Sequence, residues 1–373
     1  MRHLPQWPSS LGACQQRWAQ RWEDYASQAG RQIPNIHIED AGEAVYLGQL
    51  SPGCRACKQG TWDCVFTTMR CNLNCNFCCS PQAIAKDFAG SAFGSSPEQI
   101  IENHSKTTIS GISFSGGEPF IDKPKLFNWI GQFREYAPQK YLWLYTNGVL
   151  INRTDLQRLQ ALGIDEIRFN LAATGYNNSR VLKNLECAAQ FIPNVTVEIP
   201  AIPEHAQKVL ASLEVWTSLG VKYLNLHELI YEDGTNAASM PGPRCPLILG
   251  DGHRTEVNPK SRFLSLAVMQ KVQDDHLPLS VNDCSMQSKI RQLRGRRRSL
   301  VPLLKEPYEK LRRDEIYECY CAFRSREDYF FVHPDALRNV RRADPDYHYV
   351  RLARTAPLSL KDGGRWLVFE PIS

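Results

Sequence analysis

The chain has 373 residues, and 43% of them are hydrophobic, so it can bury a large core as one large domain or as two smaller ones. Its net charge of +5 is too small to indicate nucleic-acid binding without a localised basic patch. The N-terminal sequence lacks the apolar run of a signal peptide, and no stretch reaches the roughly 18 apolar residues of a membrane span. We therefore expect a cytoplasmic protein with no membrane partner.

The 13 cysteines are the informative part of the composition. In a reducing compartment, clustered cysteines bind metal more often than they form disulfides. Residues 1–64 form an N-terminal segment with an expected helix from Gln15 to Gln28 and then the loop "GCRACKQGTWDC", which contains Cys54, Cys57 and Cys64. A Cys-x-x-Cys pair is a recurrent half-site for iron or zinc, so we expect a metal loop here.

A second group of cysteines follows in "RCNLNCNFCC", directly after an expected strand. Cys71, Cys75 and Cys78 have the spacing Cys-x-x-x-Cys-x-x-Cys. Three thiolates on one tight loop can hold three irons of a [4Fe–4S] cluster and leave the fourth iron open to an outside molecule. Zinc, the alternative, usually binds Cys-x-x-Cys pairs in two separate places, because a tetrahedral ion needs four protein ligands. The spacing favours the iron–sulfur cluster.

Residues 65–230 alternate between short apolar runs and helix-like segments. The runs are "CVFTTM", "TISGISFSG", "KYLWLYTNG", "EIRFNLAA", "VTVEIPAI" and "VKYLNLHEL". Buried strands with helices between them indicate a parallel sheet with right-handed crossovers. We predict an α/β fold, a partial (βα)6 TIM-type barrel, followed by a C-terminal α+β extension in residues 231–373. In such barrels, functional groups gather at the carboxyl ends of the strands.

The turn "SGGEP" ends the second expected strand. Gly116 and Gly117 leave the backbone bare, so the amino and carboxyl groups of a ligand can approach it, and Glu118 adds a carboxylate for an ammonium group. A lone Gly-Gly would more often be only a tight strand-to-helix turn. Its position one strand after a three-cysteine loop favours a cofactor site.

Together these motifs resemble the radical S-adenosylmethionine (SAM) superfamily. The matching residues are "CNLNCNFC", with the aromatic Phe77 before the third cysteine, then "GGEP", then "TNG" at 146–148. The resemblance covers about residues 54–230 and implies that the amine and carboxylate of SAM chelate the open iron. It also implies that the reduced cluster cleaves SAM to a 5′-deoxyadenosyl radical, which abstracts a hydrogen atom from a substrate.

The same resemblance implies which residues hold SAM, namely Phe77, Gly116, Gly117, Glu118, Thr146, Asn147, Asn170, Glu198, Pro200 and Ile202. The glycines and Glu118 would receive the amino group, and the Thr-Asn pair would lie near the carboxylate. Asn170 would bond the ribose hydroxyls, and the last three residues would line the adenine side. Polar residues at the ends of barrel strands also serve simply as packing and caps, which is the alternative for Asn170 and for the adenine side.

Further cysteines in residues 231–373 suggest a second metal site. We predict that it is built from Cys54 and Cys57 and holds iron, an iron–sulfur cluster or zinc. Its other ligands are expected among Cys64, Cys284, Cys319 and Cys321. The alternative is that some of these cysteines are buried small hydrophobes. We expect a structural role for Cys14, Cys79 and Cys187.

A closer resemblance rests on "PGCRAC", "VEIPAIP", "LNLHEL" and an Asn-x-Cys-Ser motif before an arginine-rich stretch. These look like a poorly characterised radical SAM branch that is related to pyruvate formate-lyase activating enzymes. They are more distantly similar to the cobalamin-dependent methylases of methyl-coenzyme M reductase. The chain departs from the cobalamin signature, because "DGHRTE" at Asp251 lacks its glycine. These resemblances do not fix the substrate.

The basic run "KIRQLRGRRRS" is either a solvated helix face or a docking surface for an acidic peptide. Nucleic-acid phosphate is a weaker alternative, because the aromatic pattern of an RNA-binding module does not accompany the run.

The sequence therefore leaves three functional hypotheses. The favoured one is an oxidoreductase-type radical SAM enzyme that acts on a peptide or protein side chain, with electrons from an external flavodoxin- or ferredoxin-type donor. The second keeps the radical chemistry but acts on a small molecule or nucleotide. The third is a non-catalytic metal-binding interaction protein on a decayed scaffold, which the intact cysteines and Glu118 disfavour.

Overall fold

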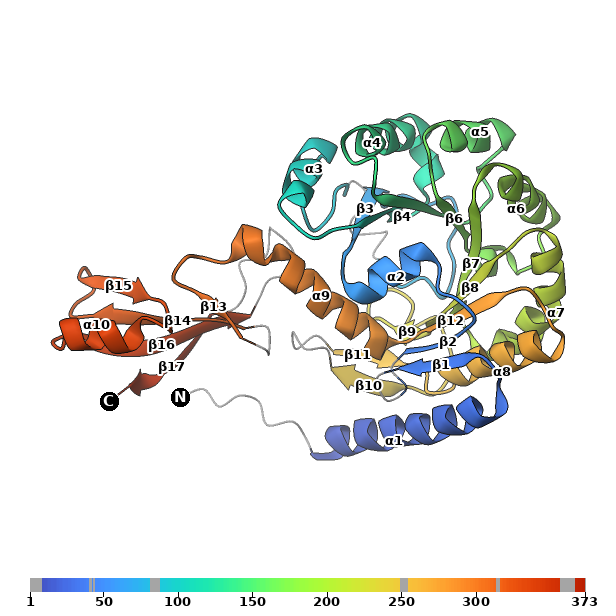
Figure 1. Cartoon of the computed structure of the whole chain (residues 1–373). Coiled ribbons are helices and arrows are strands. Elements are labelled where there is room, and N and C mark those ends of the chain that lie inside the picture. Colours follow the sequence, from blue (N-terminus) through green and yellow to red (C-terminus); the bar gives the residue numbers. More distant parts are fainter. Residues whose placement is uncertain are drawn as a thin grey trace.

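A computed structural model gives the fold of residues 9–39, 42, 44–80, 88–248, 254–312, 316–355 and 366–372. Its centre is a nine-stranded sheet in the order β1-β2-β12-β8-β7-β6-β5-β4-β3 (Figure 1). Among the residues described, no helix has both the length and the apolar character that crossing a membrane would require.

Six strands of this sheet run parallel, each paired with the next along the chain. They are β3 (Trp62–Thr68), β4 (Gly111–Gly116), β5 (Tyr141–Thr146), β6 (Glu166–Phe169), β7 (Asn194–Ala201) and β8 (Tyr223–Glu228). All four residues of β6 are buried, which is typical of a strand covered on both faces. The predicted partial (βα)6 barrel is confirmed.

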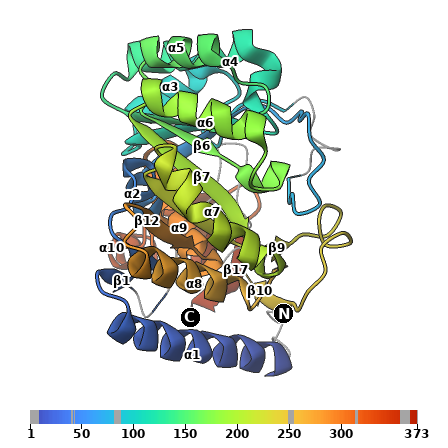
Figure 2. The same cartoon turned by 90° about the vertical axis from the view of Figure 1, so that its right-hand side faces the viewer.

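Helices return the chain between these strands and cover the outer face of the sheet (Figures 1 and 2). They are α3 (Pro97–Ser105), α4 (Lys123–Tyr136), α5 (Arg153–Ala161), α6 (Ser179–Phe191) and α7 (Ala206–Ser218). Asn152 and Asp155 form a capping box that satisfies backbone N–H groups at the start of α5. Leu126, Ile130 and Phe133 of α4 recur at helical spacing and are buried against the sheet.

The sheet extends beyond the predicted barrel, so the expected division into 1–64, 65–230 and 231–373 needs correction. β12 (Ser280–Cys284) pairs in parallel with β8, although it lies in the segment predicted as a C-terminal extension. α8 (Ser261–Asp274) precedes it and carries Arg262, whose Nε donates to Asp283 of β12 at 2.8 Å. A buried ion pair of this kind fixes the strand in the sheet, so this part of the chain belongs to the barrel.

The N-terminal segment completes the same sheet. β2 (Ala44–Leu47) pairs antiparallel with β12, and β1 (Ile36–Glu39) pairs antiparallel with β2. The helix before them, α1 (Ser9–Gln32), is longer than predicted. Three short strands form a separate sheet in the order β10-β11-β9, namely β9 (Ile230–Tyr231), β10 (Cys245–Ile248) and β11 (Arg254–Val257).

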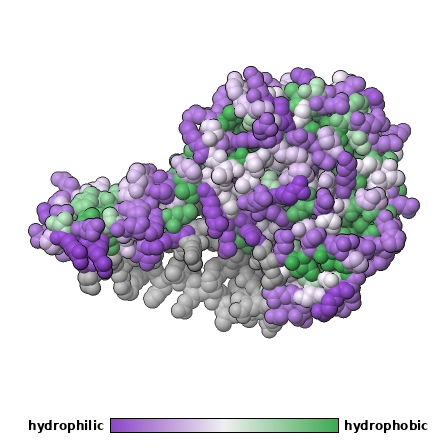
Figure 3. Space-filling view, viewed as in Figure 1, coloured by the Kyte–Doolittle hydropathy of each residue, from purple (hydrophilic) through white to green (hydrophobic). Residues whose placement is uncertain are grey.

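The end of the chain forms an α+β lobe that stands beside the barrel (Figure 1). It contains β13 (Lys310–Leu311), β14 (Ile316–Phe323), β15 (Tyr329–Val332), α10 (Leu337–Ala343), β16 (His348–Thr355) and β17 (Trp366–Ile372). Ala322, Val332 and Tyr349 form a small core of its own. Figure 3 shows hydrophobic surface over β15, where Tyr329 and Phe331 are exposed. The predicted α+β extension is therefore this lobe alone.

The predicted basic run lies on α9 (Met286–Leu304), which packs against α2 (Pro52–Gln59). Part of it is structural, because the Arg296 guanidinium lies 4.1 Å from the centre of the Trp62 ring and Arg297 is buried. Arg291, Arg294 and Arg298 are exposed. The run is therefore neither a fully solvated face nor a continuous docking surface.

We expect Gly295→Ala to destabilise the protein by about 1–3 kcal/mol, because a Cβ at Gly295 would lie 2.5 Å from the Gly60 Cα where the two helices touch. The backbone of α2 cannot yield as a flexible side chain would. The control is Gly131→Ala in α4, where the Cβ would meet a Leu162 methyl group at 3.6 Å. That change should stabilise the protein by about 0.5–1 kcal/mol through helix propensity. Urea denaturation of both variants is the measurement, and equal stabilities would contradict the close contact.

Candidate functional site

A cavity of about 420 Å³ opens at the carboxyl ends of the barrel strands. Its lining includes Ser115 and Gly116 at the end of β4, Thr146 at the end of β5, and Pro200 and His227 near the ends of β7 and β8. This is the edge at which functional groups were expected, and the volume falls within the range of about 300–1,000 Å³ typical of small-molecule sites.

The loop after β3 brings the predicted cluster ligands into this cavity. Cys71, Cys75 and Cys78 are half-buried and line it, and the Cys78 N–H closes a turn onto the Cys75 carbonyl at 3.1 Å. Burial and then the charges of Cys78 and Cys71 raise the pKa of Cys75 to about 11, so the three sulfurs lie within electrostatic reach of one another. Three thiols on one loop at one cavity wall are a donor set that suits a [4Fe–4S] cluster.

Within the described part of the chain, no three His, Cys, Asp or Glu side chains lie as close together as a bound metal would hold them. This includes the three cysteines of the cluster loop, so their thiols must turn toward one another when a cluster binds. Cys79, which we expected to be structural, also lines the cavity.

The two glycines of the "SGGEP" turn are required by a neighbouring backbone. A Cβ at Gly116, where φ is +132°, would lie 1.8 Å from the Thr68 carbonyl oxygen, and one at Gly117 would lie 2.1 Å from that of Arg70. The N–H groups of Gly117 and Glu118 donate to the same two carbonyls at 2.9 and 2.8 Å. The turn therefore holds the start of the cluster loop. From the sequence, the two glycines were expected only to let a ligand approach the backbone.

Glu118 occupies a different position from the one expected. Its carboxylate is fully buried and is not part of the cavity lining. It accepts hydrogen bonds from the Thr146 hydroxyl at 2.8 Å, from the Asn147 N–H at 2.7 Å and from the Phe120 N–H at 3.3 Å. Burial raises the pKa of Glu118 to about 7 although these donors lower it. This arrangement makes Glu118 a positioning residue for the "TNG" turn rather than a direct partner of an ammonium group.

Thr146 and Asn147 both line the cavity, as expected. The Asn147 side-chain nitrogen donates to Asn72 Oδ1 at 2.8 Å and lies 4.0 Å from Cys71 Sγ. The "TNG" turn and the cluster loop therefore touch directly, so a movement of one changes the other.

The residues expected on the ribose and adenine side divide into two groups. Asn170, Glu198 and Pro200 line the cavity, and Asn170 also caps a short helical turn by accepting from the Ala173 N–H at 3.3 Å. Ile202 does not line it, which corrects the expectation. It is buried in a small cluster against which Phe77 packs, and Phe77 itself lines the cavity.

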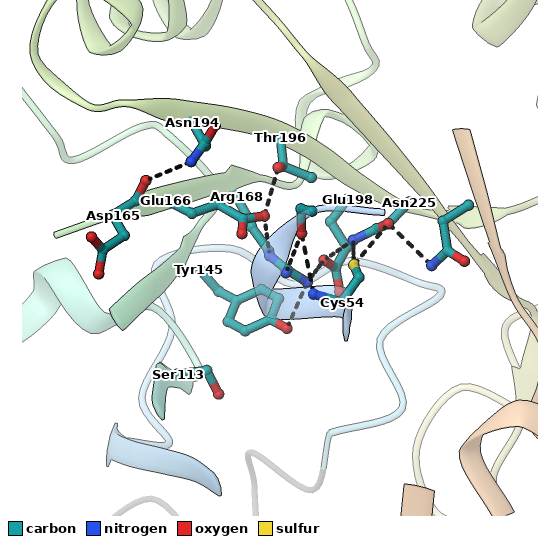
Figure 4. Close-up of polar contacts among 12 residues, drawn as sticks. Cys54, Ser113, Tyr145, Asp165, Glu166, Arg168, Asn194, Thr196, Glu198 and Asn225 are labelled. Carbon is teal, nitrogen blue, oxygen red and sulfur yellow. Dashed lines mark hydrogen bonds and ion pairs between the residues drawn. The ribbon is translucent and has the colours of Figure 1, made fainter. Parts of the chain in front are cut away.

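A charged network centred on Arg168 is drawn in Figure 4. It contributes Arg168, Glu198 and His227 to the cavity lining, which we call the floor of the cavity. Arg168 donates to Glu166 at 2.8 Å and to Glu198 at 2.7 Å, and Glu198 also binds the side chains of Asn225 and His227. Burial alone would raise the pKa of Glu198, but Arg168 and then His227 hold it well below its usual range. Glu198 is therefore an anion already committed to three partners, and its contact with adenine stays a prediction.

Sequence reasoning missed Arg168, His227 and Lys289, which all line the cavity. Arg168 lies in the buried strand β6, and Asn170 follows directly after the end of that strand; both line the cavity. A charged residue inside a buried strand is a signal that could have identified it.

The cysteines predicted for a second metal site fall into three places. Cys54, Cys57 and Cys284 line a second cavity beside the first, whereas Cys64 lines the first cavity. Cys319 and Cys321 lie on β14 of the C-terminal lobe, where Cys319 is completely buried. The prediction that they join Cys54 and Cys57 is wrong, because they are built into the sheet of a different lobe (Figure 1).

The raised pKa of Glu118 predicts a pH dependence of stability. Between about pH 4.5 and 7 the native state keeps a proton that the unfolded state has released, so this contribution is complete below pH 4.5 and is lost as the pH rises through 7. We expect the wild type to lose up to about 3 kcal/mol of unfolding free energy relative to Glu118→Gln over this interval. Urea denaturation of the cofactor-free proteins measures it, with the exposed Glu135→Gln as control. Parallel pH profiles for wild type and Glu118→Gln would contradict it.

Comparison with known proteins bears directly on this site. Residues 52–166 match a protein family described as a 4Fe-4S single cluster domain. The chain is 26% identical over 194 residues to a protein of Methanocaldococcus jannaschii described as a candidate glycyl-radical enzyme activating enzyme, a match that covers 50% of this chain and 52% of that one. It is 28% identical over 121 residues to a PqqA peptide cyclase of Granulibacter bethesdensis, covering 32% of this chain and 30% of that one.

The chain thus spans about half of the first relative and less than a third of the second. Among solved structures, SuiB of Streptococcus suis bound to S-adenosylmethionine aligns with a TM-score of 0.45 and 15% identity, over 59% of this chain and 49% of that chain.

The family match covers the cluster loop, the "SGGEP" turn and the "TNG" turn, which are the three elements that meet at the cavity. The family match supports a [4Fe–4S] cluster at this cavity. These matches support the resemblance of the chain to the radical S-adenosylmethionine superfamily.

Proposed function

We propose that this protein is a radical SAM enzyme that acts on a side chain of a peptide or protein. The observation that carries the proposal is the cavity in which three cysteines face the "TNG" turn and a charged floor. When bound, the reduced cluster and SAM supply a carbon-centred radical that removes a hydrogen atom from the substrate. Both relatives are named for action on polypeptides, one on a glycyl-radical enzyme and the other on a peptide.

The residues of this chain would divide the work by their position. Cys71, Cys75 and Cys78 would hold the cluster, and Thr146 and Asn147 would orient the amino-acid end of SAM beside it. Glu118 would keep that turn in place from behind. Apolar side chains at the cavity wall, such as Leu73 and Phe77, would exclude water from the reacting atoms.

The floor offers groups that can bind a polar substrate. Lys289 and His227 line the cavity, and burial lowers the pKa of His227, as does Lys289, although Glu198 raises it. The neutral imidazole would donate its N–H to Glu198. A lysine at the cavity surface favours a substrate with a carbonyl or carboxylate near the reacting carbon, as peptides have.

A small-molecule or nucleotide substrate is the second candidate, and the same cavity could hold it. A screen of peptides and metabolites with anaerobically reconstituted protein separates the two. Hydrogen transfer from a substrate labelled with deuterium into 5′-deoxyadenosine identifies the class. Labelling from small molecules alone would overturn the peptide assignment.

The cluster assignment predicts the result of removing its ligands. The variant with Cys71→Ala, Cys75→Ala and Cys78→Ala should lose the four irons of the cluster and form no 5′-deoxyadenosine with SAM and a low-potential reductant. Cys187→Ala, which removes a half-buried thiol on α6, is the control and should keep both. Iron analysis and chromatography of the products are the measurements. Cleavage of SAM by the triple variant would refute the assignment.

The close contact between Gly117 and the Arg70 carbonyl predicts a result that differs from the one expected if the glycine only gave a ligand room. Gly117→Ala should lose most of its iron together with SAM binding, because its Cβ would displace the Arg70 carbonyl beside Cys71. If the glycine served only the ligand, the variant would keep a full cluster and fail only to bind SAM. Iron content and SAM affinity measured on one preparation distinguish the two, and Gly131→Ala is the control.

A further inference from the structure

We propose that Cys54, Cys57 and Cys284 hold a second metal centre, a thiolate-bound iron–sulfur cluster or zinc ion, in the cavity beside the cofactor cavity. This site lies outside the three-cysteine loop of the first cluster. It does not depend on the proposed peptide substrate.

Local structure brings the three thiols together from distant parts of the chain. Ser51 caps α2 by accepting from the Cys54 N–H at 3.2 Å, and Cys54 and Cys57 follow one turn apart on that helix. Cys284 ends β12, and Ser285 then caps α9, which packs against α2. The three residues line one cavity.

The contacts of these thiols suit ligands better than packing groups. The Asn225 amide donates to Cys54 Sγ at 3.1 Å, and Cys57 Sγ donates to Gln292 Oε1 at 3.1 Å. None of the three forms a disulfide. A small buried hydrophobe would pack against carbon, whereas Cys54 and Cys57 both contact side-chain amides. An amide that donates to sulfur, as Asn225 does to Cys54, is an outer contact that orients a metal ligand.

The cavity also carries the opposite charge that a set of thiolates needs. Lys58 and Lys289 line it, as do Arg168 and its ion-pair partner Glu198, whose charges offset each other. Three thiolates around a divalent ion carry a net charge of −1, which the two lysines offset. Trp62, Met286 and Leu293 supply apolar walls, so a bound centre would be shielded from water.

The space exceeds what a single ion requires. The cavity measures about 250 Å³, whereas one water occupies about 30 Å³ in the liquid. It can therefore take an iron–sulfur cluster, or a zinc ion together with a group of the substrate as a fourth ligand. The three sulfurs lie farther apart than the ligands of a bound metal, but the same is true of Cys71, Cys75 and Cys78 among the described residues.

The two cavities share a wall, which gives the second centre a place in the chemistry. Tyr145, Arg168, Glu198, His227 and Lys289 line both of them. The Asn225 amide that donates to Cys54 also donates to Glu198 at 2.9 Å (Figure 4). A metal at Cys54 would therefore lie one amide away from the floor of the cofactor cavity, where it would be placed to bind a group of the substrate.

The test uses the full-length variant in which Cys71, Cys75 and Cys78 are alanine, so that the first cluster is absent. After anaerobic exposure to iron and sulfide, or to zinc alone, we expect it to retain metal in a fixed ratio to protein. If the variant retains iron together with inorganic sulfide and shows the visible absorption of an iron–sulfur cluster, the second centre is an iron–sulfur cluster. Retention of zinc alone identifies a mononuclear site.

Adding Cys57→Ser and Cys284→Ser to this background should remove that metal. The matched control adds Cys187→Ala and Cys321→Ala instead, which removes the same number of thiols elsewhere and should keep the metal. Circular dichroism and urea denaturation verify that each variant is folded. A further measurement uses Co²⁺ bound to the native chain in place of zinc. Its thiolate charge-transfer absorption should be weaker in each of the single variants Cys57→Ser and Cys284→Ser than in the native chain.

A folded triple variant that binds neither iron nor zinc would overturn the proposal. So would metal that remains when Cys57 and Cys284 are replaced, or a native chain whose Co²⁺ spectrum is unchanged in the single variants. Failure of the reconstituted native chain to cleave SAM, with the second centre bound, would refute the proposed function and leave this site standing.

Discussion

A single buried guanidinium holds the floor of both cavities together. Arg168 is 3% exposed and donates to Glu166, to Glu198 and, at 3.2 Å, to the Ser51 hydroxyl that caps α2. A Cβ at Gly53 would lie 2.5 Å from its Nη2, so the helix rests directly on the charge. Removing one member of a buried, hydrogen-bonded ion pair typically costs about 3–5 kcal/mol, because the remaining charge is left without a partner. The strands β6 and β7 and the helix that carries Cys54 and Cys57 therefore depend on one side chain.

The sheet could be predicted from the sequence wherever local periodicity carries the information. Six apolar runs with helical segments between them identified β3 to β8, because each βα unit buries its own face. β12 escaped prediction because its pairing with β8 joins residues that are distant in the chain, such as Ser280 and Tyr223. No local pattern marks which later strand will extend a parallel sheet. The ion pair of Arg262 with Asp283, which fixes that strand, is likewise a contact between separate elements.

The site, too, has one part that a local sequence motif identifies and one part that depends on contacts between separate elements. The start of the cluster loop and the "SGGEP" turn are held by backbone contacts, such as the Gly117 N–H on the Thr68 carbonyl, whereas the "TNG" turn is held by the Glu118 carboxylate. Because the backbone packs so closely, only glycine fits at positions 116 and 117. This requirement gives a short motif that could be recognised in the sequence. The cause of this constraint could not be recognised, because the carbonyls that exclude a Cβ belong to Thr68 at the end of β3 and to Arg70 just after it, a whole βα unit earlier in the chain.

The floor is held by side chains from separate strands, and its composition follows from charge balance rather than from a motif. Arg168 faces Glu166 and Glu198, and Glu198 in turn binds Asn225 and His227. Such a network has no fixed spacing along the chain, so sequence reasoning could place Glu198 at the cavity and still misjudge what it binds. The Asn225 amide donates both to Cys54 and to Glu198. A change in the charge of Cys54 would therefore alter the hydrogen bonding of Glu198 through this one amide. The two cavities are thus joined by side chains at the floor, whereas the glycine turn is held by backbone.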